Sequence, residues 1–357
     1  MIAQKIKLVS QRASLYTQLV RKKNSGVVSP VVANLFVTTR CNACCHYCYT
    51  DKTILKTAEL STKQWKGIID GLVDRGCRMI NLMGGEPLLR DDFPELLDHI
   101  LSRNILCDVN TNCFLVPEHI ETLSKASQIF TSVDGDETAH DLNRGKGTFA
   151  KTIAGIESAR VAGIPVRINC TVTKHNAHCI EFLVALSEKL NLFITFSPLI
   201  RVRDALIDQS AGLHMSDEEA REAFRQIKRA KKRTKRIMNS DASIDFFVNY
   251  PKPFGTIVRR DEKGPHIGYY THRCPYGVLQ HFITSNGDVF PCHNMWNEPT
   301  FKPKNVIEDG IDDPLLHAGH LWCKYCWLAN LVEWNEFTKL SWLTKGVLMT
   351  LKQVMGK

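Results

Sequence analysis

The chain of 357 residues lacks any long uninterrupted hydrophobic run. No stretch approaches the roughly 18 consecutive apolar residues that a transmembrane helix needs, so no such helix is expected. The amino terminus also lacks the compact apolar core and small-residue cleavage site of a secretory signal. These absences predict a cytoplasmic protein, in which disulfide bonds are not expected.

Acidic residues are missing from the first 50 positions, which hold seven lysines or arginines. The whole chain has a formal net charge of +9, and a second basic block, KRAKKRTKR, occupies residues 228–236. Such charge suits an anionic membrane surface or nucleic acid, although a solvated helix face explains it equally well. The block has no interleaved aromatic residues for base stacking, so it does not favour nucleic acid as a partner.

Cysteine, in contrast, is abundant, with thirteen residues. In a reducing compartment, clustered cysteines favour metal binding or catalysis over disulfides. Eight of the thirteen fall into two groups, one near the amino terminus and one in the last third of the chain. The others stand among apolar residues, where a cysteine is expected to be a small buried hydrophobic side chain. These are Cys77, Cys107, Cys113, Cys170 and Cys179.

Between residue 32 and about residue 200, six apolar strand-like runs alternate with amphipathic helical segments. This alternation predicts an α/β protein with a parallel sheet and crossover helices, and leaves open whether the sheet closes. In either arrangement the chemistry lies at the carboxyl ends of the strands. Polar segments follow the first four strands: TTRCNACCHYCYTD at 38–51, GGEP at 84–87, NTNC at 110–113 and SVDG at 132–135.

The remaining segments predict four further parts. Residues 1–31 read as a basic amphipathic helix, which packs on the protein itself or lies on a membrane. Residues 201–270 form a helical and irregular connection. Residues 271–330 carry four cysteines and a hairpin with an Asn286–Gly287 turn. Residues 331–357 predict a second amphipathic helix with flanking lysines.

Two ligand sets fit the first cysteine group. Cys41 with Cys44 and Cys45 with Cys48 would make two CxxC pairs for zinc, but zinc spacings usually place about a dozen residues between such pairs. Cys41, Cys45 and Cys48 alone have the spacing Cx3Cx2C. Three thiolates can hold three irons of a [4Fe–4S] cube, whose fourth iron then stays open to a small molecule.

The second arrangement, with the aromatic Tyr47 directly before the last cysteine, resembles the signature of the radical S-adenosylmethionine (SAM) enzymes. In that family the open iron binds SAM, and an electron from the cluster cleaves SAM to a 5′-deoxyadenosyl radical that removes hydrogen from the substrate. The resemblance covers roughly residues 32–200. It implies a partial (β/α)6, TIM-like barrel and a reductase partner such as flavodoxin or ferredoxin.

The later segments extend this resemblance. GGEP looks like the family's GGE motif, and the segment HDLNRGKGTF at 140–149 resembles a loop of the subgroup with auxiliary clusters. Relatives usually have glycine where this chain has Cys113, which is either a packing variant or a catalytic thiol that donates hydrogen to a product radical. The resemblance implies SAM contacts from Tyr47, Gly84, Gly85, Glu86, Pro87, Asn110, Ser132 and Asp134.

The second cysteine group is Cys274, Cys292, Cys323 and Cys326. Its spacing resembles the first half of the auxiliary-cluster domain called SPASM, or its shorter form, Twitch. No cysteine follows Cys326, so the resemblance implies one auxiliary [4Fe–4S] cluster that conducts electrons. Four thiolates also suit zinc, which is the alternative.

Three functions remain open at this point. The basic amphipathic ends and several aromatic residues favour a hydrophobic or membrane-associated small-molecule substrate, such as a lipid, terpenoid or tetrapyrrole. The first alternative is a maturase of a ribosomal peptide or protein, although only about 31 residues precede the first strand, few for the peptide-binding domain of such relatives. The second is a non-catalytic docking protein stabilised by metal. The aromatic residues are Phe196, Phe246, Phe247, Tyr250, Phe254, Tyr269 and Tyr270.

Overall fold

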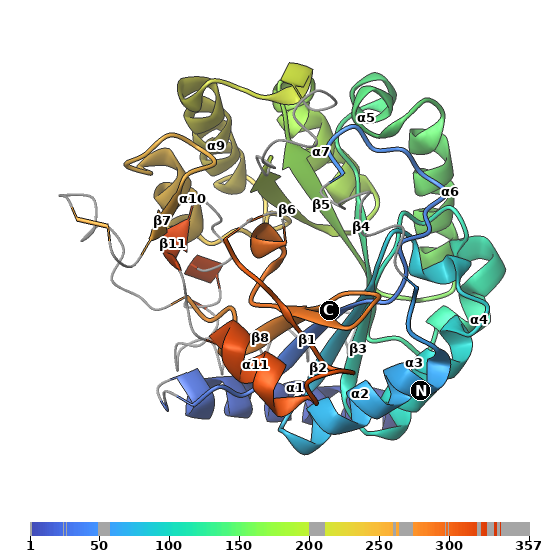
Figure 1. Ribbon diagram of the computed structural model, residues 1–357. Coiled ribbons are helices and arrows are strands. Elements are labelled where there is room, and N and C mark those ends of the chain that lie inside the picture. The colour runs from blue at the N-terminus through green and yellow to red at the C-terminus, as the bar shows by residue number, and fades with distance from the viewer. Residues whose placement is uncertain are drawn as a thin grey trace.

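A nine-stranded sheet forms the centre of the protein in the order β10-β9-β8-β1-β2-β3-β4-β5-β6 (Figure 1). Strands β1 to β6 are parallel, and each lies beside the next in the chain, which confirms the predicted α/β class. Among the described strands, β6 and β10 are the edges, so the barrel is partial and does not close. The computed structural model describes residues 2–23, 25, 27–48, 58–199, 211–259, 262–263, 274–296, 298, 300–319, 323–326, 332–333 and 336.

The described elements follow the predicted alternation of strands and helices. The strands are β1 (Val32–Phe36), β2 (Met79–Met83), β3 (Leu106–Asn110), β4 (Gln128–Ser132), β5 (Val166–Val172), β6 (Phe193–Pro198), β7 (Ile257–Arg259), β8 (Gln280–Ile283), β9 (Asp288–Phe290), β10 (Lys304–Asn305) and β11 (Cys323–Cys326). The α-helices are α1 (Ile2–Lys23), α2 (Thr62–Asp74), α3 (Phe93–Ser102), α4 (Ile120–Leu123), α5 (Glu137–Arg144), α6 (Thr148–Val161), α7 (Ile180–Lys189), α9 (Asp217–Lys231), α10 (Asp241–Val248) and α11 (Asp312–Gly319). The short 3-10 helices are η2 (Pro87–Leu89), η3 (Val116–His119), η4 (Ala177–Cys179), η5 (Ala211–Leu213) and η7 (His293–Met295).

Helices α2 to α7 surround the outer face of the parallel strands (Figure 1). Helix α2 shows why these segments fold as they do. Ser61 and Gln64 form the capping box that the sequence predicted. Trp65, Ile69 and Leu72 recur at helical spacing, and all three are fully buried in the main core. Burial of this apolar stripe fixes the helix against the sheet.

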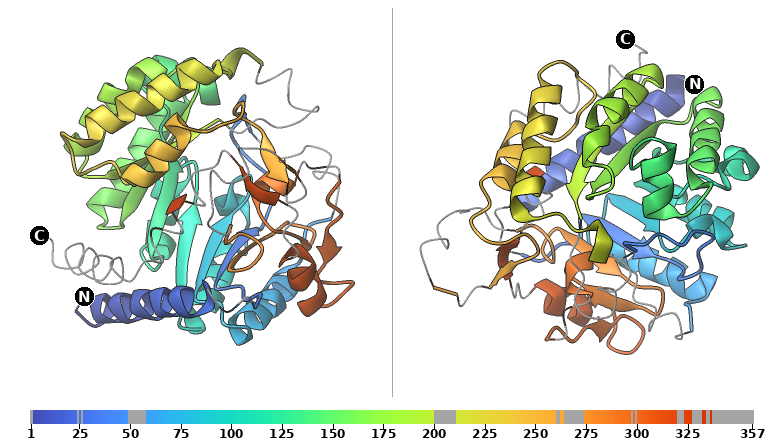
Figure 2. Two further views of the ribbon diagram at one scale, coloured as in Figure 1. Left: turned by 90° about the vertical axis from the view of Figure 1, so that its left-hand side faces the viewer. Right: turned by 90° about the horizontal axis from the view of Figure 1, so that it is seen from above.

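Helix α1 lies across the amino ends of the strands, opposite the predicted site (Figure 2). Leu15 and Leu19 are buried there against Val31, Val32 and residues that begin neighbouring strands. The predicted helix forms over Ile2–Lys23, which is shorter than the expected 1–31, and its Leu15 and Leu19 pack on the protein's own body.

The predicted hairpin with the Asn286–Gly287 turn is formed by β8 and β9. Gly287 has a φ of +96°, which favours glycine, and its amide donates to the carbonyl of Thr284 at 2.9 Å. The sequence did not predict where the hairpin lies: β8 pairs in parallel with β1 and extends the barrel sheet. Trp296 packs edge-on against Phe36 of β1, with ring centroids 4.8 Å apart. The carboxyl-terminal region is thus joined to the barrel through its core.

Candidate active site

The cysteine loop leaves the carboxyl end of β1 and is fixed to the sheet where it begins. One carboxylate oxygen of Glu59 accepts hydrogen bonds from the Thr38 hydroxyl at 2.8 Å and from the Thr39 amide at 2.7 Å. The Gly85 amide donates to the Thr38 carbonyl, and the Glu86 amide donates to the Arg40 carbonyl, both at 2.8 Å. These bonds bring the GGEP segment directly beside the first cysteine. Glu59 was not among the predicted site residues.

Gly84 and Gly85 are needed for this approach. A Cβ atom on Gly84 would lie 2.6 Å from the Thr38 carbonyl oxygen, and one on Gly85 would lie 2.3 Å from that of Arg40. Both distances are too short for any side chain, so the cysteine loop itself requires glycine at these positions. The family resemblance implied SAM contacts at these two glycines; the contact found here is with the loop that carries the cysteines.

The thiols of the loop share one electrostatic environment. Burial, together with the neighbouring Cys45, Glu86 and Cys48, raises the pKa of Cys41 to about 11. Burial also raises the pKa of Cys45. Neighbouring thiols whose ionisation is opposed in this way fit a cationic iron–sulfur group, because such a group neutralises thiolate charge. The donor set therefore fits the predicted cluster ligands Cys41, Cys45 and Cys48.

Helix α5 holds the other end of the loop. His46 is fixed by two carbonyls of this helix: its amide donates to Asn143 at 2.9 Å, and its Nδ1 lies 2.9 Å from the oxygen of Leu142. The guanidinium of Arg144 hydrogen-bonds to the Tyr47 hydroxyl, and one of its nitrogens lies 3.8 Å from Cys45 Sγ. Three successive residues of the loop thus contact the HDLNRGKGTF segment. The sequence had singled out this segment without giving Arg144 a role.

Asp134 joins these contacts to the sheet. Its carboxylate is fully buried and accepts from Arg144 Nε at 2.6 Å, from the Thr171 amide at 3.0 Å and from the Tyr47 hydroxyl. Burial raises the pKa of Tyr47 well above its ordinary value, so the hydroxyl keeps its proton. Two residues predicted to contact SAM, Tyr47 and Asp134, therefore bond to each other.

Glu86 connects the second and third strands. Its carboxylate is fully buried and accepts from the amide of Leu88 at 3.1 Å and from that of Asn112 at 2.8 Å. Burial raises the pKa of this carboxyl to about 7, against the effect of those two amides. Asn110 and Ser132 lie at the carboxyl ends of β3 and β4 and are partly exposed at the same edge of the sheet.

This edge of the sheet can be compared with known proteins. A sequence model of the radical SAM superfamily matches residues 35–186. An AdoMet-dependent heme synthase of Methanosarcina barkeri is 30% identical over 271 residues, which cover 72% of this chain and 74% of that protein. The chain belongs to the radical SAM superfamily.

Two further matches are to a maturase and to a protein bound to a precursor peptide, according to their names. The mycofactocin maturase MftC of Mycobacterium tuberculosis is 25% identical over 298 residues, covering 82% of this chain and 72% of that protein. The structure of Streptococcus suis SuiB bound to precursor peptide SuiA matches with a TM-score of 0.64 and 19% identity, over 89% of this chain and 76% of that chain. At this identity the match shows the fold, the partial barrel of the radical SAM superfamily.

Membership establishes the general chemistry. The protein is a radical SAM enzyme that uses a [4Fe–4S] cluster and SAM. The Cx3Cx2C spacing predicts Cys41, Cys45 and Cys48 as the ligands, and this assignment stays a prediction. No described helix of this radical SAM enzyme is long and apolar enough to cross a membrane.

Cys113 occupies a position that favours glycine. Its φ is +71°, and its side chain is fully buried in the main core of the barrel. Gly155 of α6 packs so closely that a Cβ there would lie 2.0 Å from the Cys113 carbonyl oxygen. Burial raises the pKa of the thiol to about 12. This position favours a packing role, and the suggested hydrogen donation stays a prediction.

The auxiliary cysteines lie on separate segments of the radical SAM chain. Cys274 is buried, and Cys292 directly precedes η7. Strand β11 carries Cys323 and Cys326 and pairs antiparallel with β7. The side-chain nitrogen Nδ2 of Asn294 lies 3.9 Å from Cys326 Sγ. The assignment of these four residues to one cluster stays a prediction. Tyr269, Tyr270 and most of the predicted 331–357 helix lie outside the described residues.

Proposed function

We propose that this radical SAM enzyme matures a ribosomally made peptide. The observation that carries the proposal is the extent of similarity: MftC covers 82% of this chain and the SuiB–SuiA complex 89%, so both matches reach beyond the 152-residue barrel segment at 35–186. The partial barrel also supports it. Its described strands leave the sheet open between β6 and β10, which suits a long substrate.

The features that favoured a hydrophobic or membrane-associated substrate are engaged elsewhere. Phe247 stacks on Phe224 with centroids 4.2 Å apart, and the Tyr250 hydroxyl donates to the Thr256 carbonyl at 2.7 Å. These aromatics are core residues. Helix α1 buries Leu15 and Leu19 on the sheet, so this part of its apolar face is not offered to a lipid surface. The structure therefore gives less support to a lipid or terpenoid than the sequence suggested.

Three of the seven basic residues in the block at 228–236 form ion pairs within the protein. Lys228 pairs with Asp245 at 2.5 Å, Arg229 with Glu222 at 2.7 Å and Arg233 with Glu181 at 2.5 Å. Exposed pairs of this kind contribute little stability, but they reduce the positive potential that a phosphate backbone would meet. They support a solvated helix face in place of a nucleic-acid surface.

The residues at the sheet edge have distinct proposed tasks. When bound, the cluster and SAM supply the 5′-deoxyadenosyl radical. Cys41, Cys45 and Cys48 would hold the cluster, Glu59 and Arg144 hold the loop that carries them, and Glu86 fixes GGEP against Asn112. The exposed ends of β3 and β4, at Asn110 and Ser132, would face SAM.

The cysteines at 274, 292, 323 and 326 would hold one auxiliary [4Fe–4S] cluster, which would supply a one-electron acceptor near the substrate. A small flavoprotein or ferredoxin-type reductase would supply the first electron. Removing Cys41, Cys45 and Cys48 together by alanine substitution should abolish 5′-deoxyadenosine formation and leave about half of the iron, because one of the two predicted four-iron clusters remains. Loss of all iron would argue against the auxiliary cluster.

A second candidate substrate is a tetrapyrrole, because the heme synthase of M. barkeri is 30% identical over 271 residues. The deciding experiment incubates the reconstituted, reduced enzyme and SAM separately with short peptides encoded beside its gene and with an iron porphyrin that carries carboxylate side chains. A peptide mass change with matching 5′-deoxyadenosine is the expected result. Turnover of the porphyrin alone would replace the peptide proposal with the tetrapyrrole.

A further inference from the structure

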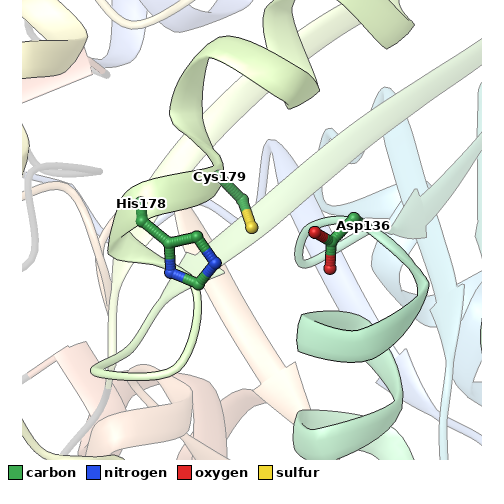
Figure 3. A group of neighbouring side chains, drawn as sticks. All are labelled: Asp136, His178 and Cys179. Carbon is green, nitrogen blue, oxygen red and sulfur yellow. The ribbon is translucent and has the colours of Figure 1, made fainter.

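A second group of metal-ligating side chains lies on the loops that follow β4 and β5. Asp136 is the residue before α5, and His178 and Cys179 are consecutive in η4, just before α7. The three ligand atoms lie within 4.8 Å of one another. Figure 3 shows the imidazole, thiol and carboxylate pointing toward one common point. None of these residues belongs to the two cysteine groups described above.

The two loops hold these side chains in place without a metal. One oxygen of Asp136 accepts from the Ala139 amide at 2.9 Å, as the amino-terminal cap of α5, and leaves its second oxygen for another partner. Asn176 is buried and fixes η4: its Nδ2 donates to the Thr171 carbonyl at 2.7 Å, and its backbone carbonyl accepts from the Cys179 amide at 2.8 Å. Ligands on such anchored segments need little reorganisation to bind an ion.

Glycine brings the sulfur close to the aspartate. Gly135 has a φ of +154°, and a Cβ on this residue would lie 3.1 Å from Cys179 Sγ. The same Cβ would lie 2.8 Å from the Cβ of Ala139, so a larger residue at this position would crowd both α5 and the thiol. The thiol is 2% exposed while His178 is exposed, so the group has a buried inner ligand and a ligand open to solvent. An ion can therefore enter from the surface.

We propose that Asp136, His178 and Cys179 form a zinc site with three protein ligands and one open coordination position. The donor set is a carboxylate oxygen, an imidazole nitrogen and a sulfur, all of which are ordinary zinc ligands. Carboxylate and thiolate together balance the two positive charges, and the neutral imidazole adds none. Zinc bonds of about 2.0–2.3 Å place tetrahedral ligand atoms roughly 3.5 Å apart. Side-chain rotations that move the three ligand atoms by about 1 Å would therefore complete the site.

Cysteine binds zinc as a thiolate, so the Cys179 proton must leave when the metal binds. Zinc displaces this proton to solvent when the Zn–S bond forms, and no electron is transferred. Bound zinc would tie the loop that carries Asp134 to the loop after β5. The site is independent of the proposed peptide substrate.

The test uses full-length enzyme with its iron–sulfur clusters reconstituted under anaerobic conditions. After equilibration with one equivalent of zinc and desalting, metal analysis should find about one zinc per chain with unchanged iron. X-ray absorption at the zinc edge should show one sulfur and otherwise nitrogen or oxygen ligands. Competition with a chromogenic chelator should show at least tenfold weaker binding for His178→Ala and for Asp136→Asn.

The substitutions separate metal binding from folding. Asp136→Asn keeps an oxygen that can cap α5 but removes the charge, and His178 is exposed, so both variants should fold. His119→Ala, at a partly exposed histidine that ends η3, should bind zinc as the unaltered enzyme does. Failure of the unaltered enzyme to retain zinc would overturn the proposal. So would three or four sulfur ligands, which would place the zinc at the cluster cysteines, or unchanged affinity in both variants.

Discussion

The guanidinium of Arg144 lies 5.2 Å from the centroid of the Tyr47 ring and also hydrogen-bonds to its hydroxyl. These two residues are 97 positions apart in the chain. The contact joins the end of α5 to the residue that precedes the last predicted cluster cysteine. Together with Asp134 it makes a buried polar group, which fixes the shape of the cysteine loop from outside the loop.

Removing the Arg144 charge should destabilise the protein strongly. Arg144→Ala leaves the fully buried Asp134 carboxylate without its cation, which should cost about 3–5 kcal/mol in free energy of unfolding. The double variant Asp134→Asn, Arg144→Gln should lose less unfolding free energy than the sum of the losses in Asp134→Asn and Arg144→Gln made singly, because no isolated buried charge remains. Denaturant unfolding measures both, with the exposed Arg160→Ala as the control. Additive costs would show that the pair is not coupled.

Glu86→Gln should weaken the link between GGEP and the third strand. Each carboxylate oxygen accepts a backbone amide, whereas glutamine offers one oxygen and one donor, so one buried amide loses its acceptor. We expect a loss of about 1–3 kcal/mol in unfolding free energy. Glu95→Gln, at a partly exposed surface pair with Lys66, should cost less than about 1 kcal/mol. Equal losses in the two variants would contradict this role of Glu86.

The alternation of parallel strands and helices could be predicted from the sequence, and so could the two cysteine groups, because both are local patterns of periodicity and motif. Glu59 and Arg144 could not be found in this way. Each acts on the cysteine loop through contacts that only the folded sheet creates, across 20 and 97 positions. The pairing of β8 with β1 could not be predicted either. The two strands are far apart in the chain, and no local sequence pattern indicates which distant strand will be the neighbour.

Cys113 should act through packing. Cys113→Ala keeps a small side chain at a φ of +71°, so 5′-deoxyadenosine formation and product formation should both persist. Cys113→Val should lower the unfolding free energy by about 2 kcal/mol or more, because a β-branched residue is strained at positive φ and presses on Gly155. If Cys113→Ala still cleaves SAM but no longer forms product, the thiol is a hydrogen donor instead.

His281 should make stability depend on pH below neutrality. It is fully buried on β8, its Nε2 lies 3.3 Å from the Leu315 carbonyl oxygen, and burial lowers its pKa to about 4. Between its ordinary pKa of about 6.5 and 4, the unfolded chain binds more protons than the folded one, so stability falls as the pH falls.

His281→Gln keeps a donor toward Leu315 but does not titrate. Subtracting the unfolding free energy of this variant from that of the unaltered protein removes the titrations they share. The difference should decrease by about 1.4 kcal/mol for each unit of pKa shift as the pH falls through this range. A difference that stays constant between pH 7 and pH 4 would show that His281 is not held neutral.

The central claim is that three of the four clustered cysteines hold the cluster. Cys44→Ala and Cys45→Ala change adjacent residues of one loop, so they are matched in chemistry and position. After anaerobic reconstitution, the most direct measurement is the amount of 5′-deoxyadenosine formed from SAM under dithionite, together with iron per chain. We predict that Cys44→Ala retains both and that Cys45→Ala loses 5′-deoxyadenosine formation and the iron of that cluster. Loss of both in Cys44→Ala would contradict the account.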